Sequence, residues 1–252
     1  MAGRLWVFDL DNTLVATSRS YGCATAKFAI LMLGVLGWRA PQLSEIIKLY
    51  TEIDNKRTKI YGAARHRFPG SLVVCYRQLC DQVGASKDEE IISQVWQIGE
   101  KAFSLDFYLQ DQLIPGVEKT LNFLKAQGDD LLVLTKGDPL VQWRKWTGYN
   151  LGCWFPSAKE FRVVRWEPRA GYSGDKGPAL AELRKKYPER KIYMVGDSVD
   201  SDIIPAVEVG VIAIHIPAWS KWSWRSEASP LPEGVILLKK IADIIEQYES
   251  TL

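Results

Sequence analysis

The sequence of 252 residues predicts an α/β protein, a parallel sheet with helices on both faces into which an all-helical domain is inserted. Three observations indicate this fold class. Residues 5–8 form a short apolar run, and from residue 130 onward short apolar runs alternate with amphipathic stretches. Between these parts, residues 15–112 keep helical periodicity without a strand-like run. Alternating strands and helices are typical of right-handed βαβ units on a parallel sheet.

Residues 15–112 are expected to form the inserted domain, a helical cap. Its amphipathic helices are expected over residues 23–36, 43–58, 72–83 and 87–107. Pro115 and Gly116 mark the return to the core, where a helix over residues 117–126 stops at Gly128. Because the block begins directly after the first strand, it can overhang the end of that strand and close on a substrate.

The remaining segments, residues 1–14 and 113–252, are expected to form a Rossmann-like core. Residues 5–8 would supply its first strand, and the later strands are expected over residues 131–135, 163–165, 191–195 and 211–216. The expected helices of this part cover residues 139–149, 177–187, 201–209 and 239–248. Residues 220–234, rich in Ser, Pro and Trp, are expected to form an irregular surface loop.

The composition is that of an ordinary soluble globular protein. A net charge of +2 gives no support to a role in coating nucleic acid or binding a membrane surface. The four cysteines show no C-x-x-C spacing, and no cleavable signal precedes the first strand, which predicts reduced thiols and a cytoplasmic location. The most apolar stretch, residues 28–38, is shorter than the roughly 20 residues that span a bilayer and predicts a buried helix. We expect a monomer or a homodimer.

Two carboxylates, Asp9 and Asp11, follow the first apolar strand. Like charges at the end of a buried strand raise each other's cost of ionisation unless a cation lies between them. Alternation along the strand places both on the same side, and an all-oxygen ligand set suits Mg²⁺ rather than Zn²⁺. The alternative interpretation is a simple turn, because Asp11 followed by Asn12 also favours a loop.

Polar residues also follow two later strands and open one helix. They are Thr135, Lys136 and Gly137 after one strand, Gly196, Asp197 and Asp202 after another, and Lys176 at the start of a helix. Ligands of parallel sheets lie beyond the carboxyl ends of the strands, where Gly137 lets backbone N–H groups approach an anion. Taken singly, each residue could be a helix cap, a turn or a solvated lysine. Together, they predict a single site at one edge of the sheet.

These residues resemble the four ordered motifs of the haloacid dehalogenase superfamily of phosphohydrolases. Asp9, Leu10, Asp11, Asn12 and Thr13 match the first motif. The later motifs are matched by Thr135, by Lys176, and by Gly196 and Asp197 with Asp202. The resemblance covers nearly the whole chain, including a helical cap between the first and second motifs, and four motifs in order are far more specific than one short pattern.

The resemblance implies a role for each residue. Asp9 would attack phosphorus to give an aspartyl-phosphate, and Asp11 would protonate the leaving oxygen and then activate water. Mg²⁺ would be held by the Asp9 carboxylate, the Asp11 backbone carbonyl and Asp197, with Asp202 as a further ligand or support. Thr135 and Lys176 would bind the phosphoryl oxygens, with Lys136 and Gly137 beside them.

The implied function is a Mg²⁺-dependent phosphatase that acts on the phosphate monoester of a small metabolite. In the dehalogenases of the superfamily the residue two after the nucleophile is not an acid, so Asp11 argues against cleavage of a carbon–halogen bond. Two alternatives stay open. One is a phosphoryl transferase of the mutase kind, which shares every core residue, and the other is a non-catalytic binding member, against which the intact acids argue.

Substrate choice would come from the cap and from the loop after the first motif. The candidates there are Arg19 and Tyr21, together with the basic stretches at residues 56–59 and 65–67. Cations facing the site would favour a second anionic group on the substrate, whereas the alternative for residues 56–59 is a solvated helix face. A deep cap favours a small molecule over a protein or nucleic-acid substrate.

Overall fold

A computed structural model of the chain describes residues 3–218 and 229–250 and confirms the predicted fold class. Its sheet has seven strands in the order β4-β3-β2-β1-β5-β6-β7. The strands are β1 (Leu5–Phe8), β2 (Asp130–Gly137), β3 (Phe161–Glu167), β4 (Tyr172–Ser173), β5 (Ile192–Gly196), β6 (Ile212–His215) and β7 (Ile236–Leu237). All neighbours pair in parallel except β3 and the short strand β4, which pair antiparallel. The two short strands β4 and β7 are not among the predicted elements, and most of the expected loop at residues 220–234 lies outside the described residues.

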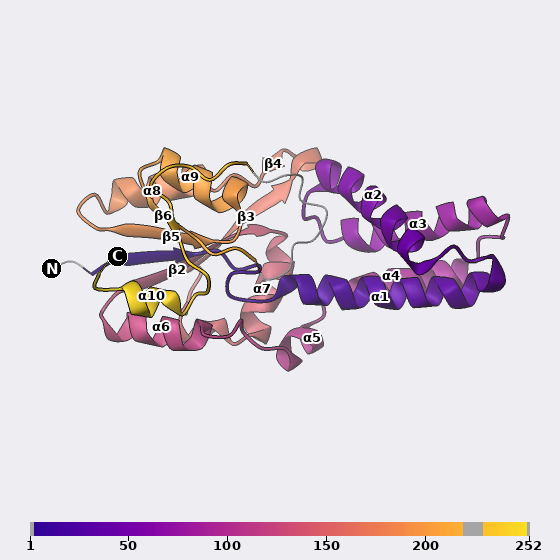
Figure 1. The fold of residues 1–252 in the computed structure, drawn as a ribbon, viewed down its shortest axis with the longest axis horizontal. Helices are drawn as coiled ribbons and strands as arrows, with labels where there is room; N and C mark the ends of the chain where they lie inside the picture. Colours follow the sequence, from indigo (N-terminus) through magenta and orange to yellow (C-terminus); the bar gives the residue numbers. More distant parts are fainter. Residues whose placement is uncertain (1–2, 219–228, 251–252) are drawn as a thin grey trace.

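Helices cover both faces of this sheet (Figure 1). On one face lie α6 (Val117–Ala126), α7 (Pro139–Gly148) and α10 (Asp243–Gln247), and on the other α8 (Gly177–Lys186) and α9 (Ile204–Glu208). Trp6 and Phe8 point into the first layer, whereas Leu5 and Val7 point into the second. Burial on both faces explains why the core strands read as continuous apolar runs rather than as alternating ones.

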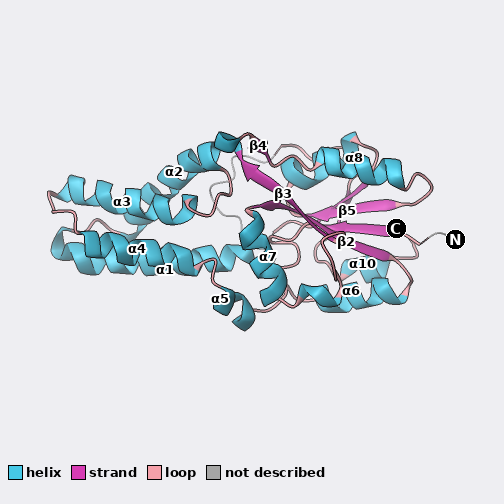
Figure 2. Cartoon of the chain, turned by 180° about the vertical axis from the view of Figure 1, so that it is seen from behind, coloured by secondary structure: helices cyan, strands magenta, loops and turns pink. Residues whose placement is uncertain are grey.

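The helical cap extends from the carboxyl end of the sheet, as Figures 1 and 2 show from opposite sides. It consists of α1 (Thr17–Leu36), α2 (Leu43–Tyr61), α3 (Arg67–Val83) and α4 (Glu89–Lys101), which share a hydrophobic core of their own. The prediction of one continuous helix over residues 87–107 is wrong. The segment is interrupted at residues 102–104, and Ser104 Oγ caps a separate helix α5 (Leu105–Gln110) by accepting a hydrogen bond from the Phe107 N–H at 3.2 Å.

Helix α5 belongs with the sheet rather than with the cap. Phe103 packs in the hydrophobic cluster of the cap, whereas Phe107 and Tyr108 pack in a cluster of the core. The chain therefore returns to the core between Phe103 and Phe107, a few residues before the expected boundary at 112.

Helix α1 is longer and less buried than the sequence predicts. Phe28 and Met32 pack into the cap, but Ile30 is 67% exposed and Trp38, just beyond the helix, is 94% exposed. The expectation of a buried helix is therefore correct for one face only. By length and composition alone, Thr17–Arg39 is the one helix within residues 3–218 and 229–250 that could cross a membrane, a test that core helices also pass.

The segment after β5 also differs from the helix expected over residues 201–209. A wide π-type turn, Val199–Ile203, comes first, and α9 begins only at Ile204. The Ser198 hydroxyl accepts from the Ser201 N–H at 3.3 Å and starts this turn. Pro205 near the start of α9 is compatible with the first turn of a helix because N–H groups there have no intrahelical partner.

A buried carboxylate, Asp129, ties the first strand to the end of the chain. It accepts hydrogen bonds from the Arg4 N–H at 2.8 Å, from Trp6 Nε1 at 2.7 Å and from the Tyr248 hydroxyl at 2.9 Å. Both side-chain donors are buried with it, so they have no access to water as a substitute partner.

We predict that Asp129→Ala lowers the free energy of unfolding by about 3 kcal/mol, because it leaves the Trp6 and Tyr248 donors buried and unsatisfied. Urea denaturation followed by tryptophan fluorescence measures the change. Asp130→Ala is the matched control, since that exposed side chain pairs at the surface with Arg190 and its loss is expected to cost less than about 1 kcal/mol. Equal losses in the two variants contradict the prediction.

Candidate active site

The carboxyl ends of the central strands bring together residues that are far apart in the sequence. Strand β1 lies between β2 and β5 in the sheet. Asp9 and Asp197 directly follow β1 and β5, and Thr135 lies near the end of β2. The Asp9 N–H continues the β1–β5 pairing by donating to the Val195 carbonyl at 2.8 Å. The backbone at this edge is therefore fixed by the sheet itself.

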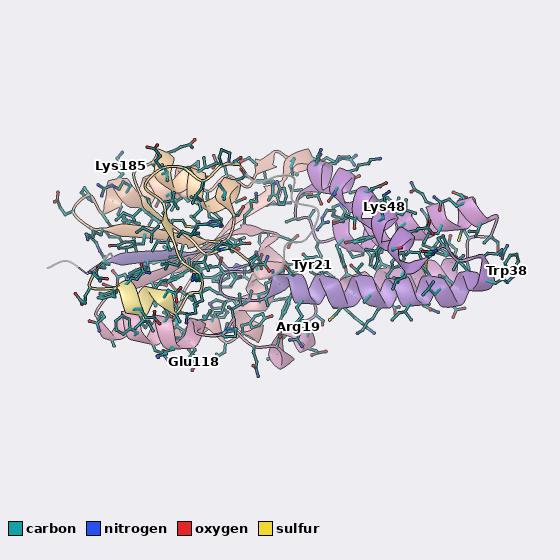
Figure 3. The ribbon with its side chains drawn as sticks, viewed as in Figure 1. Arg19, Tyr21, Trp38, Lys48, Glu118 and Lys185 are labelled. Carbon is teal, nitrogen blue, oxygen red and sulfur yellow. The ribbon has the colours of Figure 1, made fainter. Side chains whose placement is uncertain are left out.

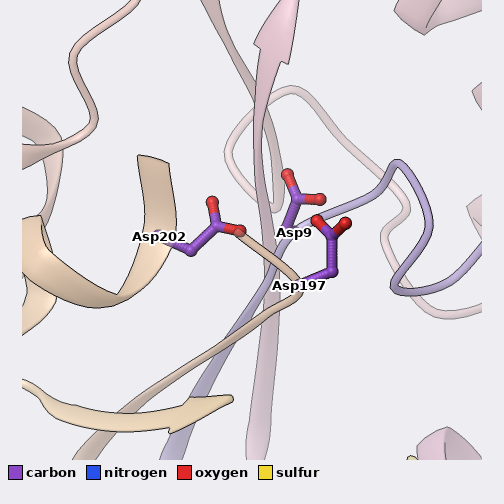
Figure 4. Close-up of side chains that lie close together, drawn as sticks. All are labelled: Asp9, Asp197 and Asp202. Carbon is purple, nitrogen blue, oxygen red and sulfur yellow. The ribbon is translucent and has the colours of Figure 1, made fainter. Parts of the chain in front are cut away.

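Three carboxylates, those of Asp9, Asp197 and Asp202, lie within 4.8 Å of one another and are buried (Figure 4). The turn after β5 directs Asp202 back toward the strand, where its Oδ2 accepts from the Ser198 N–H at 3.0 Å. Gly196 makes this approach possible, because a Cβ at that position would lie 2.3 Å from Asp202 Oδ2. Glycine is therefore required there for close contact rather than for its backbone angle.

Lys176 inserts its ammonium group among these acids. It directly precedes α8, its exposed fraction is 1%, and Nζ lies 2.6 Å from both Asp9 Oδ1 and Asp202 Oδ1. Burial lowers the pKa of Lys176, but the carboxylates of Asp202 and Asp9 outweigh it and raise the pKa overall. The lysine therefore keeps its positive charge.

The cluster still carries more negative than positive charge. Burial raises the pKa of Asp9 to about 8, Lys176 opposes the rise, and Asp202, Asp197 and Asp11 add to it. One ammonium group thus does not offset three buried carboxylates. An all-oxygen donor set with excess negative charge fits a hard divalent cation. Asp9, Asp197 and Asp202 are the side chains that could hold it.

The side chain of Asp11 has other partners. Its Oδ1 lies 2.5 Å from Lys145 Nζ, its Oδ2 accepts from Gln142 Nε2 at 2.8 Å, and the Thr17 hydroxyl also donates to it. Burial raises the pKa of Asp11, but Lys145 and the hydrogen bonds from Lys145, Thr17 and Gln142 lower it further, so the net pKa lies below its usual value. With its carboxylate so committed, the Asp11 side chain lies outside the carboxylate cluster, and its backbone carbonyl as a metal ligand stays a prediction.

Gln142 and Lys145, both on α7, are residues of the site that the sequence reasoning missed. Gln142 Nε2 also contacts Thr135 Oγ1 at 2.9 Å and the Lys136 carbonyl at 3.2 Å. Gly137 leaves room for this amide, because a Cβ there would lie 2.7 Å from Nε2. Their spacing of three along a helix that follows a motif strand places them on one face, and this was the signal available in the sequence.

The structure places the remaining predicted residues as follows. Lys136 Nζ donates to the Ser201 hydroxyl at 3.0 Å and lies 4.2 Å from the centre of the Trp166 ring. Lys136 and Lys176 line one cavity of about 210 Å³, so Lys136 lies beside the carboxylate cluster.

Arg19 and Tyr21 have partners in other parts of the structure (Figure 3). The Arg19 side chain is largely exposed and pairs with Asp111. The Tyr21 ring packs edge to face against Phe68 and Phe103, in the aromatic cluster of the cap. Their assignment to substrate binding stays a prediction.

The basic stretch at residues 65–67 does not present unpaired cations. Arg65 pairs with Glu100, and Arg67 pairs with Asp54. Both carboxylates come from other helices of the cap, so the sequence pattern of positive charge did not reveal the neutralisation. A cluster of cations that attracts a second anionic group is therefore not what the fold builds from Arg65 and Arg67.

The chain belongs to the family described as haloacid dehalogenase-like hydrolase, whose model matches residues 4–210. This confirms the resemblance read from the four motifs. No curated protein matches the chain significantly.

Solved structures share the fold at low sequence identity. A haloacid dehalogenase-like family hydrolase from Xanthomonas campestris is 22% identical, with a TM-score of 0.65 over 92% of this chain and 88% of that one. The HAD-hydrolase YfnB from Bacillus subtilis, bound to magnesium, is 16% identical. Its TM-score is 0.61, over 99% of this chain and 100% of that one. A predicted phosphoglycolate phosphatase from Haemophilus somnus is 21% identical, with a TM-score of 0.57 over 99% of each chain. L-2-haloacid dehalogenases are also among the similar structures.

We predict that Mg²⁺ raises the melting temperature of the protein, because it relieves the repulsion within the carboxylate cluster. Mg²⁺ at a concentration 100 times its Kd would raise the free energy of unfolding by about 2.7 kcal/mol. Differential scanning fluorimetry with and without Mg²⁺ measures the shift, and Asp197→Asn is expected to abolish it.

Asp200→Asn is the matched control for this experiment. Asp200 lies in the turn Val199–Ile203, which also holds Asp202, but it is exposed and outside the carboxylate cluster. The rise in melting temperature with Mg²⁺ is therefore expected to persist. A Mg²⁺ shift retained by Asp197→Asn contradicts the assignment of the cluster as the metal site.

Proposed function

We propose that this chain is a Mg²⁺-dependent phosphatase that hydrolyses the phosphate monoester of a small metabolite through an aspartyl-phosphate on Asp9. The observation that carries the proposal is the pair of acids at the end of β1, whose environments differ. Asp9 lies in the carboxylate cluster beside Lys176, whereas Asp11, two residues on, is held by Lys145 and Gln142. Two carboxyl groups that lie so close in the chain but have such different partners are suited to separate chemical roles.

Asp9 is the nucleophile of the proposed reaction. Its attack on phosphorus forms the Asp9 Oδ–phosphorus bond and breaks the bond to the leaving oxygen, which splits one displacement into two easier steps. Bound Mg²⁺ supplies positive charge that lets a carboxylate approach a phosphate dianion. Lys176 Nζ, already 2.6 Å from Asp9, supplies a second positive charge that faces the transferring phosphoryl group.

Thr135 and Asp11 complete the proposed chemistry. The Thr135 hydroxyl oxygen accepts a hydrogen bond from Gln142 Nε2. The hydrogen of the same hydroxyl can then be donated to a phosphoryl oxygen. Asp11 accepts a proton from the water that attacks phosphorus in the second step, a role that suits its lowered pKa. In the first step it must be protonated to donate to the leaving oxygen. Lys145, Gln142 and Thr17 keep its carboxylate in one orientation for both steps.

Two other reactions share parts of this site. Haloacid dehalogenases are among the similar structures, but the second acid Asp11, with partners from α1 and α7, supports phosphoryl chemistry over carbon–halogen cleavage. A phosphoryl transferase of the mutase kind would use the same core residues and differ in how the cap excludes water. We propose hydrolysis, in the cytoplasm, of a small metabolite rather than of a protein or a nucleic acid, by a monomer or a homodimer.

We predict that Asp9→Asn lowers phosphatase turnover at least ~10³-fold, because the amide cannot form the covalent intermediate. Phosphate release from p-nitrophenyl phosphate with Mg²⁺ measures turnover, and circular dichroism checks the fold. Wild-type rates in this variant would overturn the assignment of the nucleophile. If the wild-type protein releases halide from 2-chloropropionate and no phosphate from p-nitrophenyl phosphate, it is a dehalogenase.

We predict that Lys145→Met lowers kcat at least ~10-fold with a smaller change in KM, because Asp11 loses the ammonium group that orients it. Steady-state kinetics on p-nitrophenyl phosphate separate the two constants. Lys185→Met, on the solvent face of α8, is the control and is expected to match the wild type (Figure 3). A Lys145→Met enzyme with unchanged kcat contradicts the role of Lys145.

A further inference from the structure

A cavity of about 460 Å³ lies between the cap and the carboxyl ends of β2 and β3. Among the residues that line it are Arg65, Trp96 and Glu100 from the cap, and Asp138, Arg165 and Glu167 from the core. Arg165 pairs in register with Gly137, the last residue of the strand that carries Thr135. The cavity therefore lies at the same edge of the sheet as the candidate active site.

Two backbone N–H groups of the cap donate hydrogen bonds to the core beside this cavity. The Ala63 N–H donates to the Trp166 carbonyl at 2.9 Å, and the Arg65 N–H donates to Asp138 Oδ2 at 3.2 Å. Gly62 has a φ of +57°, and a Cβ there would lie 2.5 Å from the Trp166 carbonyl oxygen. The cap loop at residues 62–66 is thus built to approach β3 closely, which gives the cavity a defined shape.

The charges in the cavity are already paired. Arg65 Nε lies 3.1 Å from Glu100 Oε2, and Arg165 Nη2 lies 2.5 Å from Glu167 Oε2. The Asp138 carboxylate accepts from the N–H groups at the start of α7 as well as from Arg65. Two guanidinium groups face three carboxylates, so these side chains carry a net negative charge. A second carboxylate or phosphate on the substrate would meet repulsion here.

Hydroxyl groups suit the same surroundings. Paired guanidinium and carboxylate groups still offer N–H donors and oxygen acceptors, and a hydroxyl can both donate and accept. Trp96 on α4 is 39% exposed and lines the cavity, so it presents an aromatic surface to the C–H groups of a ring or chain. A cavity with an aromatic wall and a few polar groups of both kinds is typical of a site for a small polar molecule.

We infer that this cavity receives an uncharged, polyhydroxylated leaving group, so that the substrate is the monophosphate of a sugar or polyol. This inference rests on the proposed phosphatase function. It excludes a phosphorylated carboxylic acid and a bisphosphate as preferred substrates, in contrast to the second anionic group that the basic sequence pattern suggested.

Substrate comparison tests the inference on the full chain with Mg²⁺. Phosphate release is measured from sorbitol 6-phosphate, glucose 6-phosphate, 2-phosphoglycolate and fructose 1,6-bisphosphate, with acetyl phosphate as a probe whose leaving group is too small to fill the cavity. We expect kcat/KM for the better of the two monophosphates to exceed that for 2-phosphoglycolate and for the bisphosphate at least ~10-fold. A preference for 2-phosphoglycolate or the bisphosphate overturns the inference.

Two variants link that preference to the cavity. Trp96→Ala is expected to lower the ratio of kcat/KM for the sugar or polyol phosphate to that for acetyl phosphate at least ~10-fold. Glu100→Gln leaves Arg65 without its carboxylate partner, so the ratio for 2-phosphoglycolate to the polyol phosphate is expected to rise at least ~10-fold. Glu182→Gln removes an exposed partner of Arg162 outside the cavity and is expected to change neither ratio. Ratios unchanged in the first two variants contradict the inference.

The failure of this inference and the failure of the proposed function give different results. Mg²⁺-dependent hydrolysis of acetyl phosphate together with a preference for anionic leaving groups overturns the inference and keeps the function. Absence of phosphate release from every substrate and from acetyl phosphate overturns both.

Discussion

The contact of Lys176 with two buried carboxylates is the interaction on which the candidate active site depends. Asp9 and Asp202 come from different segments, and each lies 2.6 Å from the same ammonium nitrogen. Burial makes any unpaired charge at this position costly, so the ends of β1 and β5 and the start of α8 must meet for the cluster to exist. Gly196 is a consequence of the same constraint, because any side chain there would displace Asp202. The remaining excess of negative charge makes the site suitable for a divalent cation, whose charge would in turn let a phosphate approach.

Asp9 and Asp11 show how a fold gives different properties to two identical side chains. Asp9 is surrounded by acids and has a raised pKa, whereas Asp11 contacts Lys145 and has a lowered one. The difference arises because α7 packs against the turn after β1 and presents Lys145 and Gln142 to Asp11. Gln142 also joins Asp11 to Thr135, so the second acid and the end of β2 are held by one amide group. Orientation in this site thus comes from a helix that contributes no group to the metal cluster.

Where the cap meets the core, it presents paired rather than free arginines. Arg65 and Arg67 are each paired within the cap, and the loop at residues 62–66 is joined to β3 by the hydrogen bond from the Ala63 N–H to the Trp166 carbonyl. On the inference drawn above, a cap whose arginines are neutralised would favour hydroxyl groups over anionic groups on the substrate. Family membership and fold similarity leave this choice open, because structures with the same architecture include a predicted phosphoglycolate phosphatase and haloacid dehalogenases.

The sequence by itself determined the order of the longer strands and helices, the helical insert and the acids, lysine and threonine of the four motifs. These follow from local rules, since apolar periodicity defines an element and parallel strands direct their carboxyl ends to one edge. Only the tertiary structure decided which partners those residues have. Lys145 lies 134 positions from Asp11, and Glu100 lies 35 positions from Arg65, so neither pairing leaves a local pattern in the sequence. The break before α5 and the exposed face of α1 were likewise set by packing between elements, where burial depends on neighbours that periodicity does not identify.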